Sequence, residues 1–335
     1  MTKVAINGFG RIGRAFLRAS HSEKELEVVA INDLTSPENL AYLLKYDTVY
    51  GRTPFSVEAK GSSLIIDGRE VPVIAEKDPA KLPWKEKNVD IVVEATGIFT
   101  SAEKAQAHIT AGAKRVVITA PAKGEGVDTI LIGANDEKFA NATQITSNAS
   151  CTTNACSPII GVLEEAIGIE RAILNTTHAY TATQSIVDGP APDDFRRGRA
   201  GAANLGPSST GAAKATTIVH TSLKNKFDGI AVRVPVPAGS IVDITFVSKK
   251  PTTVEEVNDA MRKAAAGEKW KRVFAVTEEP LVSSDILGQP YGAIVDLQMT
   301  RVVDGTLVKV LAWYDNEMGY VHTLLEHVKE VGKHL

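Results

Sequence analysis

The sequence has few cysteines, and their placement excludes two kinds of site. Only two occur in 335 residues, Cys151 and Cys156, five positions apart in one segment. If that segment is helical, the pair points to different faces, so we expect no disulfide. With no cluster of histidines nearby, two cysteines also make a poor zinc site, and we expect no bound metal.

Long apolar runs and an excess of charge are also missing. No apolar run approaches the length that spans a bilayer. A formal net charge of −3 provides no overall field to attract nucleic acid or an anionic membrane. The opening residues, MTKVAINGFG, read as a strand without a basic and apolar leader, so we expect a cytoplasmic protein. The length is sufficient for two domains.

Strand and helix patterns alternate over residues 1–150. Helical spacing is found from the glycine turn to about Ala19, at 37–46 and at 101–113, and residues 55–76 read as inserted antiparallel strands. Buried strands are predicted at 3–7, 26–33, 89–97, 114–122, 129–135 and 144–150. This alternation predicts a doubly wound, mostly parallel sheet in an α/β domain.

The pattern changes after residue 150. A helix is predicted at 153–168, followed by a strand that ends near His178 and a stretch of little regular pattern, 179–209. Long strands are predicted at 228–237, 240–250, 292–305 and 306–316, with a helix at 253–267. We therefore expect an α+β second domain, 151–316, built on a mainly antiparallel sheet. The amphipathic C-terminal helix, 317–335, is assigned to the first domain.

The glycine motif Gly8-x-Gly10-x-x-Gly13 lies between the first strand and the first helix, and Asp33 ends the next strand. In this context the motif indicates dinucleotide binding, with Gly8 in the turn, Gly10 at the pyrophosphate and Gly13 where helix and strand pack closely. Asp33 would bind a ribose hydroxyl pair and repel a 2′-phosphate, which favours NAD over NADP. The alternatives are a turn with glycines for geometry alone and an aspartate that caps a helix.

Cys151 follows a strand and begins a helix, where the helix dipole would lower its thiol pKa and favour thiolate. His178, at the end of the following strand, can supply the base. The alternatives are a buried small residue for Cys151 and a hydrogen-bonded core histidine for His178. A thiolate and a nicotinamide cofactor together can oxidise an aldehyde through a hemithioacetal to a thioester, which passes to water, phosphate or another acceptor. The Cys151 backbone N–H, beside Thr152, can stabilise the oxyanion.

Five motifs occur in order along nearly the whole chain: INGFGRIGR, SNASCTTN, STGAAKA, AVRVP and WYDNEMGY. Together they resemble the phosphorylating glyceraldehyde-3-phosphate dehydrogenases of glycolysis. The resemblance implies a Rossmann domain, an antiparallel catalytic domain, a homotetramer, and NAD-dependent conversion of D-glyceraldehyde 3-phosphate and inorganic phosphate to 1,3-bisphosphoglycerate. Residues 179–209 would form a loop that reaches a neighbouring subunit's cofactor site.

The same resemblance implies roles for individual residues. Cys151 would be the nucleophile and His178 the base. The cofactor would be bound by Gly8, Gly10, Arg11, Ile12, Gly13, Asp33, Lys77, Thr96, Gly97, Thr119, Asn316 and Tyr320. Substrate phosphate would be held by Thr181, Thr183 and Arg233, and inorganic phosphate by Ser150, Thr152, Thr210 and Gly211, with Arg196 also in the phosphate-binding set.

The sequence departs from the family pattern at one point near the nucleophile. The second cysteine usually lies four residues after the first, but Ala155 stands there and Cys156 follows, so the resemblance assigns no redox role to this thiol. Three other functions are weighed: a dehydrogenase of erythrose 4-phosphate or another sugar-phosphate aldehyde, a non-catalytic NAD-binding scaffold, and a thiol hydrolase. The last would leave the glycine motif and Asp33 unexplained.

Overall fold

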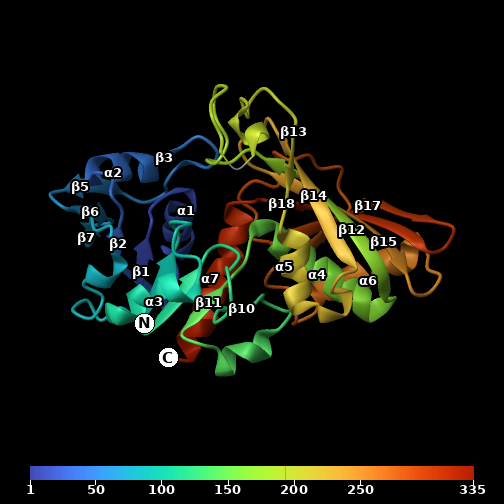
Figure 1. Ribbon diagram of the computed structural model, residues 1–335, viewed down its shortest axis with the longest axis horizontal. Coiled ribbons are helices and arrows are strands. Elements are labelled where there is room, and N and C mark those ends of the chain that lie inside the picture. The colour runs from blue at the N-terminus through green and yellow to red at the C-terminus, as the bar shows by residue number, and fades with distance from the viewer. Residues whose placement is uncertain (193) are drawn as a thin grey trace. The chain divides into compact units, whose positions relative to one another are not determined.

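A computed structural model describes residues 1–192 and 194–335 (Figure 1). The chain forms two compact units. The first contains Met1–Ile130, Asn135–Ala149 and Leu324–Leu335, and the second contains Leu131–Ala134 and Ser150–Thr323. Each is described separately.

The first unit is built on a nine-stranded sheet in the order β10-β11-β9-β8-β1-β2-β7-β6-β5. Its strands are β1 (Thr2–Asn7), β2 (Leu26–Asn32), β5 (Val57–Lys60), β6 (Ser63–Ile66), β7 (Arg69–Ile74), β8 (Ile91–Glu94), β9 (Arg115–Ile118), β10 (Asp128–Thr129) and β11 (Ile145–Ser147). The central strands pair in parallel, while β5, β6 and β7 form antiparallel hairpins. The predicted doubly wound sheet and its antiparallel insertion are confirmed.

Three α-helices belong to this unit: α1 (Arg11–Ser20), α2 (Pro37–Lys45) and α3 (Ala102–Thr110). Ser36 caps α2, with Pro37 at the first helical position as its sequence suggests. Short 3-10 turns cover Pro79–Lys81 and Asp136–Asn141, and a small hairpin joins β3 (Tyr46–Asp47) to β4 (Gly51–Arg52). That hairpin was not predicted, because two-residue strands leave no periodic signal.

The strand predicted at 129–135 is wrong over most of its length. Only Asp128 and Thr129 pair, in β10, and the chain then turns through Ile132–Ala134. Gly133 has φ +83°, and a Cβ on it would lie 2.5 Å from a ring carbon of Trp270. A positive φ and the contact with a tryptophan ring are tertiary constraints, so an apolar pattern alone does not reveal them.

The second unit is built on a seven-stranded sheet in the order β13-β14-β12-β15-β18-β17-β16. Its strands are β12 (Ile169–Ala179), β13 (Gly206–Ser209), β14 (Phe227–Val234), β15 (Ser240–Ser248), β16 (Phe274–Thr277), β17 (Ala293–Val303) and β18 (Leu307–Tyr314). The pairs β12–β14 and β16–β17 are parallel and the others antiparallel. The predicted α+β architecture with a mainly antiparallel sheet is confirmed.

Helices α4 (Cys151–Ala166), α5 (Ala212–Val219) and α6 (Val254–Ala266) pack on this sheet, and short 3-10 turns cover Phe195–Gly198 and Thr221–Leu223. Side chains of β15 alternate strictly between buried and half-buried, which is the period of a strand with one covered face. The last helix, α7 (Met318–Lys333), begins in the second unit and ends in the first. Within the described residues, no helix is long and apolar enough to span a bilayer.

A buried histidine holds the end of α7 in the first unit. His327 is fully buried, with its Nδ1 donating to the Ile130 carbonyl at 3.2 Å and its Nε2 accepting from the Thr146 hydroxyl at 2.8 Å. Burial lowers the pKa of His327 from 6.5 to about 3, although the bond to Ile130 acts in the opposite direction. The side chain is therefore neutral in the folded protein at every pH above about 3.

This burial predicts a pH-dependent stability. Between pH 6.5 and 3 the unfolded chain binds a proton at His327 that the folded chain does not, so the stabilisation is complete above pH 6.5 and is lost as pH falls. The loss approaches about 1.4 kcal/mol per pH unit. His327→Asn, which retains a donor but does not titrate, is expected to be less stable than wild type at pH 8, by about 1–3 kcal/mol. Urea unfolding should show this difference shrinking towards pH 5, and a constant difference would contradict the prediction.

Candidate active site and cofactor pocket

The loop before α4 places Cys151 at the first position of that helix. Ala149 has φ +54°, a value uncommon for a residue with a Cβ, which turns the chain sharply after β11. Ser150 is then the N-cap, and its hydroxyl accepts from the Thr153 backbone N–H at 3.1 Å. The Cys151 side chain is thereby fixed beside the helix N-terminus.

His178 lies next to this thiol. It is the second-last residue of β12, the strand that follows α4, and it is 4% exposed. Its Nε2 lies 3.4 Å from Cys151 Sγ, a distance suited to transfer of the thiol proton. The strand–helix–strand excursion has brought together two residues that are 27 positions apart in sequence.

The charge state of the pair differs from the sequence-based expectation. Loss of water around the sulfur raises the pKa of the Cys151 thiol, and the opposing effects of the Arg233 charge and of hydrogen bonds from Thr152 are smaller. Burial, followed by the Arg233 charge, lowers the pKa of His178 to about 3. The expected preference for thiolate is therefore wrong, because desolvation outweighs the favourable end of the helix dipole. Burial thus disfavours the charged form of both members of the pair.

The second ring nitrogen of His178 faces two competing partners. Its Nδ1 is 2.7 Å from the Ala179 carbonyl, which can only accept, and 2.6 Å from Arg233 Nη1, which can only donate. When Nδ1 carries the ring proton and donates a hydrogen bond to the Ala179 carbonyl, Nε2 is unprotonated and can take the thiol proton. With Nδ1 accepting from Arg233, the proton lies on Nε2 instead. Arg233 therefore influences which tautomer faces the sulfur.

Arg233 reaches this position from β14, where it pairs in register with His178 on the parallel strand β12. Thr181 and Thr183 follow the end of β12, with their hydroxyl oxygens 3.0 Å apart. His178 thus contacts both of the other predicted residues, Cys151 through Nε2 and Arg233 through Nδ1.

A buried tyrosine that the sequence analysis did not assign supports the same site. The Tyr314 hydroxyl lies 2.9 Å from Thr152 Oγ1 and 2.8 Å from Thr176 Oγ1, and its ring meets that of His178 edge-on. Thr152 Oγ1 in turn lies 4.0 Å from Cys151 Sγ. The WYDNEMGY motif contains Tyr314 two residues before Asn316, so its position was the one signal that could have nominated it.

Asn316 is held by Ser240, a second residue that the sequence analysis missed. Asn316 Oδ1 accepts from the Ser240 hydroxyl at 2.9 Å and from the Gly239 backbone N–H at 3.1 Å. The Ser240 hydroxyl also accepts from the Ala179 backbone N–H at 3.1 Å. These bonds orient the Asn316 amide, while Tyr320, also predicted for the cofactor, is 3% exposed within α7.

The other predicted phosphate residues show no direct contact with Cys151 in the described part of the chain. Gly211 is the N-cap of α5, and Thr210 Oγ1 accepts from the Ala212 backbone N–H at 3.2 Å. Arg196 is exposed in the 3-10 turn Phe195–Gly198. The Thr210 hydroxyl therefore bonds the backbone at the start of α5, which leaves its second lone pair and its proton for another partner.

In the first unit, two of the three motif glycines, Gly8 and Gly13, occupy positions that a side chain could not share. Gly8 has φ +92°, and a Cβ on it would lie 2.8 Å from the Ala95 carbonyl carbon. A Cβ on Gly13 would lie 2.2 Å from the Gly8 carbonyl oxygen, so the close packing of α1 on β1 requires glycine there. Gly10 faces open space at the N-terminus of α1.

This open space belongs to a pocket of about 540 Å³ at the carboxyl ends of the parallel strands. It is lined by Asn7, Gly8, Gly10, Asn32, Asp33, Leu34, Glu76, Lys77, Ala95, Thr96, Ile98 and Phe99. The structure thus brings five predicted cofactor residues together, namely Gly8, Gly10, Asp33, Lys77 and Thr96. Of the others, Arg11 begins α1 and pairs with Asp47, and Ile12, Gly97 and Thr119 lie in the same unit without lining the pocket.

The residues present fit a dinucleotide. A Cβ at Gly10 would fill the space that backbone N–H groups at a helix start offer to a pyrophosphate. Asp33 accepts one bond to each oxygen, from the Phe9 backbone N–H at 2.8 Å and the Thr35 backbone N–H at 2.9 Å, so both oxygens are fixed at the pocket and keep capacity for ribose hydroxyls.

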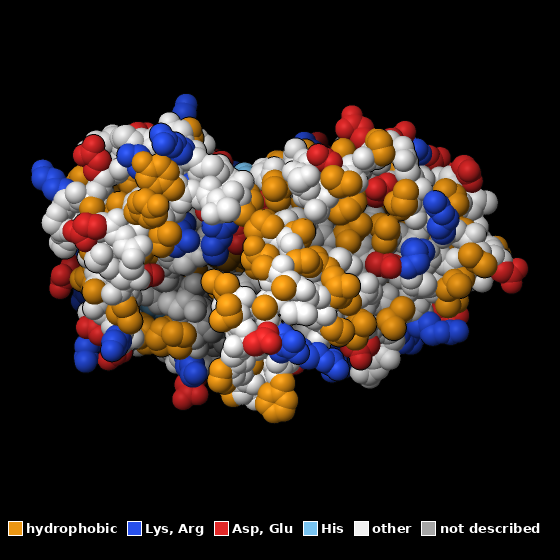
Figure 2. Space-filling model, turned by 90° about the horizontal axis from the view of Figure 1, so that it is seen from above, with side chains coloured by type: hydrophobic (Ala, Val, Ile, Leu, Met, Phe, Trp, Pro, Cys, Tyr) orange, Lys and Arg blue, Asp and Glu red, His pale blue; other side chains and the backbone are white. Residues whose placement is uncertain are grey.

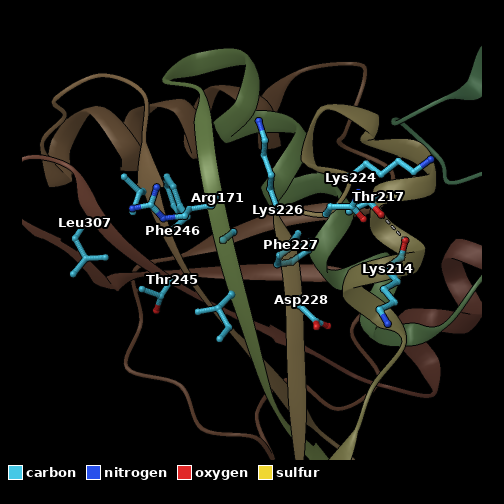
Figure 3. A pocket seen from close by; sticks show the side chains of 14 residues that line it. Arg171, Lys214, Thr217, Lys224, Lys226, Phe227, Asp228, Thr245, Phe246 and Leu307 are labelled. Carbon is cyan, nitrogen blue, oxygen red and sulfur yellow. Dashed lines mark hydrogen bonds between the residues drawn. The ribbon is translucent and has the colours of Figure 1, made fainter.

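A separate pocket of about 770 Å³ lies on the second unit, between α5 and the ends of β12, β14 and β15 (Figure 3). Basic side chains surround it, including Arg171, Lys214 and Lys226, with Asp228 nearby and Phe246 among the apolar residues. None of the predicted site residues lines it, and its lining contains no cysteine, serine or histidine. We therefore assign no chemistry to it.

Comparisons with known proteins agree with this site. Residues 2–102 match the family model for the NAD binding domain of glyceraldehyde 3-phosphate dehydrogenase, and residues 150–316 match that for its C-terminal domain. Curated proteins named glyceraldehyde-3-phosphate dehydrogenase are similar over nearly their full length. The Clostridium pasteurianum protein is 49% identical over 99% of this chain and 100% of its own. The Geobacillus stearothermophilus protein is 50% identical over 97% of this chain and 96% of its own. The Thermotoga maritima protein is 51% identical over 97% of this chain and 98% of its own.

The chain matches both family models. It combines a thiol beside a histidine in one unit with a dinucleotide pocket in the other. The cofactor is therefore NAD, the chemistry is that of an oxidoreductase, and the chain belongs to the glyceraldehyde-3-phosphate dehydrogenase family.

Proposed function

We propose that this chain catalyses the reversible oxidative phosphorylation of D-glyceraldehyde 3-phosphate to 1,3-bisphosphoglycerate in glycolysis, with Cys151 as the nucleophile. The observation that carries this proposal is the 3.4 Å separation of Cys151 Sγ and His178 Nε2 at the start of a helix. The names of the relatives favour this substrate over erythrose 4-phosphate or another sugar-phosphate aldehyde.

In the first step His178 acts as the general base. Its Nε2 accepts the thiol proton while the sulfur forms a bond to the aldehyde carbon, which gives the oxyanion of a hemithioacetal and a protonated imidazole. The first four N–H groups of a helix have no intrahelical partner, and we assign that of Cys151 to the developing oxyanion. The Ala179 carbonyl stabilises the protonated ring through Nδ1–H.

In the second half of the reaction the thioester is transferred to phosphate. NAD+ supplies the hydride acceptor when bound, and the substrate carbon is then held on Cys151 as a thioester. An oxygen of hydrogen phosphate attacks this carbon and the carbon–sulfur bond breaks. The departing thiolate recovers the proton held on His178, and the proton of hydrogen phosphate passes to solvent.

We assign the two phosphates to different sets of residues. Thr181, Thr183 and Arg233 supply two hydroxyls and a guanidinium for the substrate phosphate, which is the donor set that such an oxyanion requires. A phosphate bound there draws Arg233 away from His178 Nδ1, which favours the tautomer with a free Nε2. Inorganic phosphate is assigned to Ser150, Thr152, Thr210 and Gly211, with Arg196 in the same phosphate-binding set.

The test of the proposal is the dependence of NADH formation on phosphate. We expect steady turnover with NAD+, glyceraldehyde 3-phosphate and inorganic phosphate, followed by absorbance of NADH. Omission of phosphate should leave one turnover per Cys151, because the thioester then accumulates. A comparable steady rate without phosphate would identify a hydrolytic dehydrogenase and contradict the proposal.

We also propose a homotetramer. Figure 2 shows hydrophobic side chains gathered on a face of the second unit. The exposed apolar residues of this unit include Ile186, Val187, Phe195 and Leu205 in the segment 179–209, and Ile173 and Ile230 on the sheet. Exposed apolar groups in such numbers are typical of interfaces. Sedimentation at micromolar concentration should give four times the chain mass, and a monomer would refute this assembly.

The domain roles and the location extend the same proposal. We assign cofactor binding to residues 1–150 with 317–335, and the covalent chemistry to 151–316. Both cysteines are free thiols, which is the usual state in the reducing cytoplasm. A cytoplasmic enzyme with small-molecule substrates is the corresponding proposal for location and partners.

A further inference from the structure

A buried carboxylate lies beneath the dinucleotide pocket and no step of the proposed reaction uses it. Glu94 ends β8 and is 1% exposed. Its Oε2 accepts from Asn7 Nδ2 at 2.6 Å and from His108 Nε2 at 3.0 Å. Its Oε1 accepts from the Thr96 backbone N–H at 2.9 Å and from the Thr96 hydroxyl. Within the described residues, no lysine or arginine forms an ion pair with it.

The directions of these bonds are fixed from outside the cluster. The Glu76 backbone N–H donates to Asn32 Oδ1 at 3.0 Å, so Asn32 Nδ2 donates to Asn7 Oδ1 at 2.7 Å. Asn7 Nδ2 is then left to donate to Glu94. On the other side, the Ile98 backbone N–H donates to Thr96 Oγ1 at 3.1 Å, which directs the Thr96 hydroxyl proton to Glu94.

His108 is held as a neutral donor by the same logic. The indole Nε1 of buried Trp84 can only donate, and it lies 3.0 Å from His108 Nδ1. Nδ1 therefore accepts, and the ring proton lies on Nε2, which donates to Glu94. Asn7 Nδ2 and His108 Nε2 lie 3.3 Å apart because both approach the same oxygen. Every one of these neighbours donates to Glu94, and none of them is cationic.

The groups that Glu94 holds form the walls of the pocket. Thr96 and Ile98 lie in the loop after β8, Asn7 ends β1, Asn32 ends β2 and Glu76 follows β7, and all five line the pocket. Asn32 also donates to the Glu76 carbonyl at 2.9 Å, which closes the chain of bonds at β7. One carboxylate is thus connected, directly or through Asn7, to the ends of four parallel strands.

We propose that Glu94 is a positioning residue for NAD, whose buried carboxylate aligns the loops after β1, β2, β7 and β8 into the shape that binds the dinucleotide. Its two oxygens stabilise that shape because they accept all four hydrogen bonds at once, and an amide side chain of the same size cannot. Trp84 and His108 maintain this state, since His108 remains a donor only while Trp84 occupies Nδ1. The inference rests on the proposed binding of NAD in this pocket.

The variant that tests it is Glu94→Gln, which keeps the shape and replaces one acceptor oxygen by an N–H₂ donor. Its amide N–H₂ must face two groups that are themselves donors, so the loop at Thr96 or the Asn7 side chain has to move. We expect the Kd for NAD+, measured by calorimetry, to rise about tenfold, as unpaired buried donors cost that order of affinity. The KM for NAD+ should rise in parallel, while kcat at saturating NAD+ stays within about threefold, because Glu94 touches no reacting group.

His327→Asn is the matched control, because His327 is another fully buried histidine of the first unit that does not line the pocket. It should lower the thermal midpoint and leave the Kd for NAD+ unchanged, which separates positioning from general destabilisation. If Glu94→Gln fails to fold, His108→Gln is the variant that tests the inference. We expect it to raise the Kd for NAD+ about threefold. A Kd equal to wild type in the deciding variant would overturn this inference alone. Failure of the wild type to bind NAD+ would overturn the proposed function with it.

Discussion

Cys151→Ser is expected to lower the rate of NADH formation by about four orders of magnitude or more. The thiol forms the covalent bond to substrate. A serine hydroxyl at this position is a far weaker nucleophile, even with His178 beside it as a base. The substitution removes little volume at the start of α4, so the fold and the NAD pocket in the first unit should be retained. The rate is measured by absorbance of NADH at saturating substrate and phosphate, with the Kd for NAD+ determined on the same sample.

Cys156→Ala is the matched control for the nucleophile. Cys156 is fully buried in the same helix, and burial raises its thiol pKa well above the usual range, so it stays protonated and inaccessible. The variant should therefore retain turnover near that of wild type. The assignment of Cys151 as the nucleophile would be wrong if Cys151→Ser kept turnover within tenfold of wild type. It would also be wrong if turnover were lost in Cys156→Ala alone.

The sequence was informative where function depends on local backbone geometry. The tight turn at Gly8 and the packing of Gly13 on the Gly8 carbonyl are set by contacts within a few residues, and the motif spacing contains them. The alternation of helix and strand likewise predicted both sheets, since periodicity reflects which face of each element is buried. The contact between Cys151 and His178 follows from the same topology, because the carboxyl end of β12 returns to the start of α4.

Features that arise from tertiary packing could not be predicted in this way. Whether the Cys151 pKa rises or falls depends on desolvation and on Arg233, which arrives from another strand 82 positions later in the numbering. Tyr314 acts through Thr152 and Thr176, and Asn7 bonds Glu94 on the adjacent strand β8, so their partners are distant in sequence. A single sequence gives the residue types at these positions but not which side chains share a buried space.

His178→Asn is expected to slow turnover by about 10²–10⁴-fold, the range for loss of a general base, while the Kd for NAD+ stays nearly unchanged. Asparagine keeps a polar group near the Ala179 carbonyl but has no basic nitrogen towards the sulfur.

Because the Cys151 pKa is raised, thiolate then forms only by ionisation to solvent, and its population grows about tenfold per pH unit below that pKa. The residual rate, and the rate of alkylation of Cys151 by iodoacetamide, should therefore rise with this slope between pH 6 and 9. The wild type should depend less on pH, since His178, with a pKa of about 3, remains an available base throughout that range. Equal pH slopes for variant and wild type would show that thiolate forms without His178, and the role of the histidine as base would then be refuted.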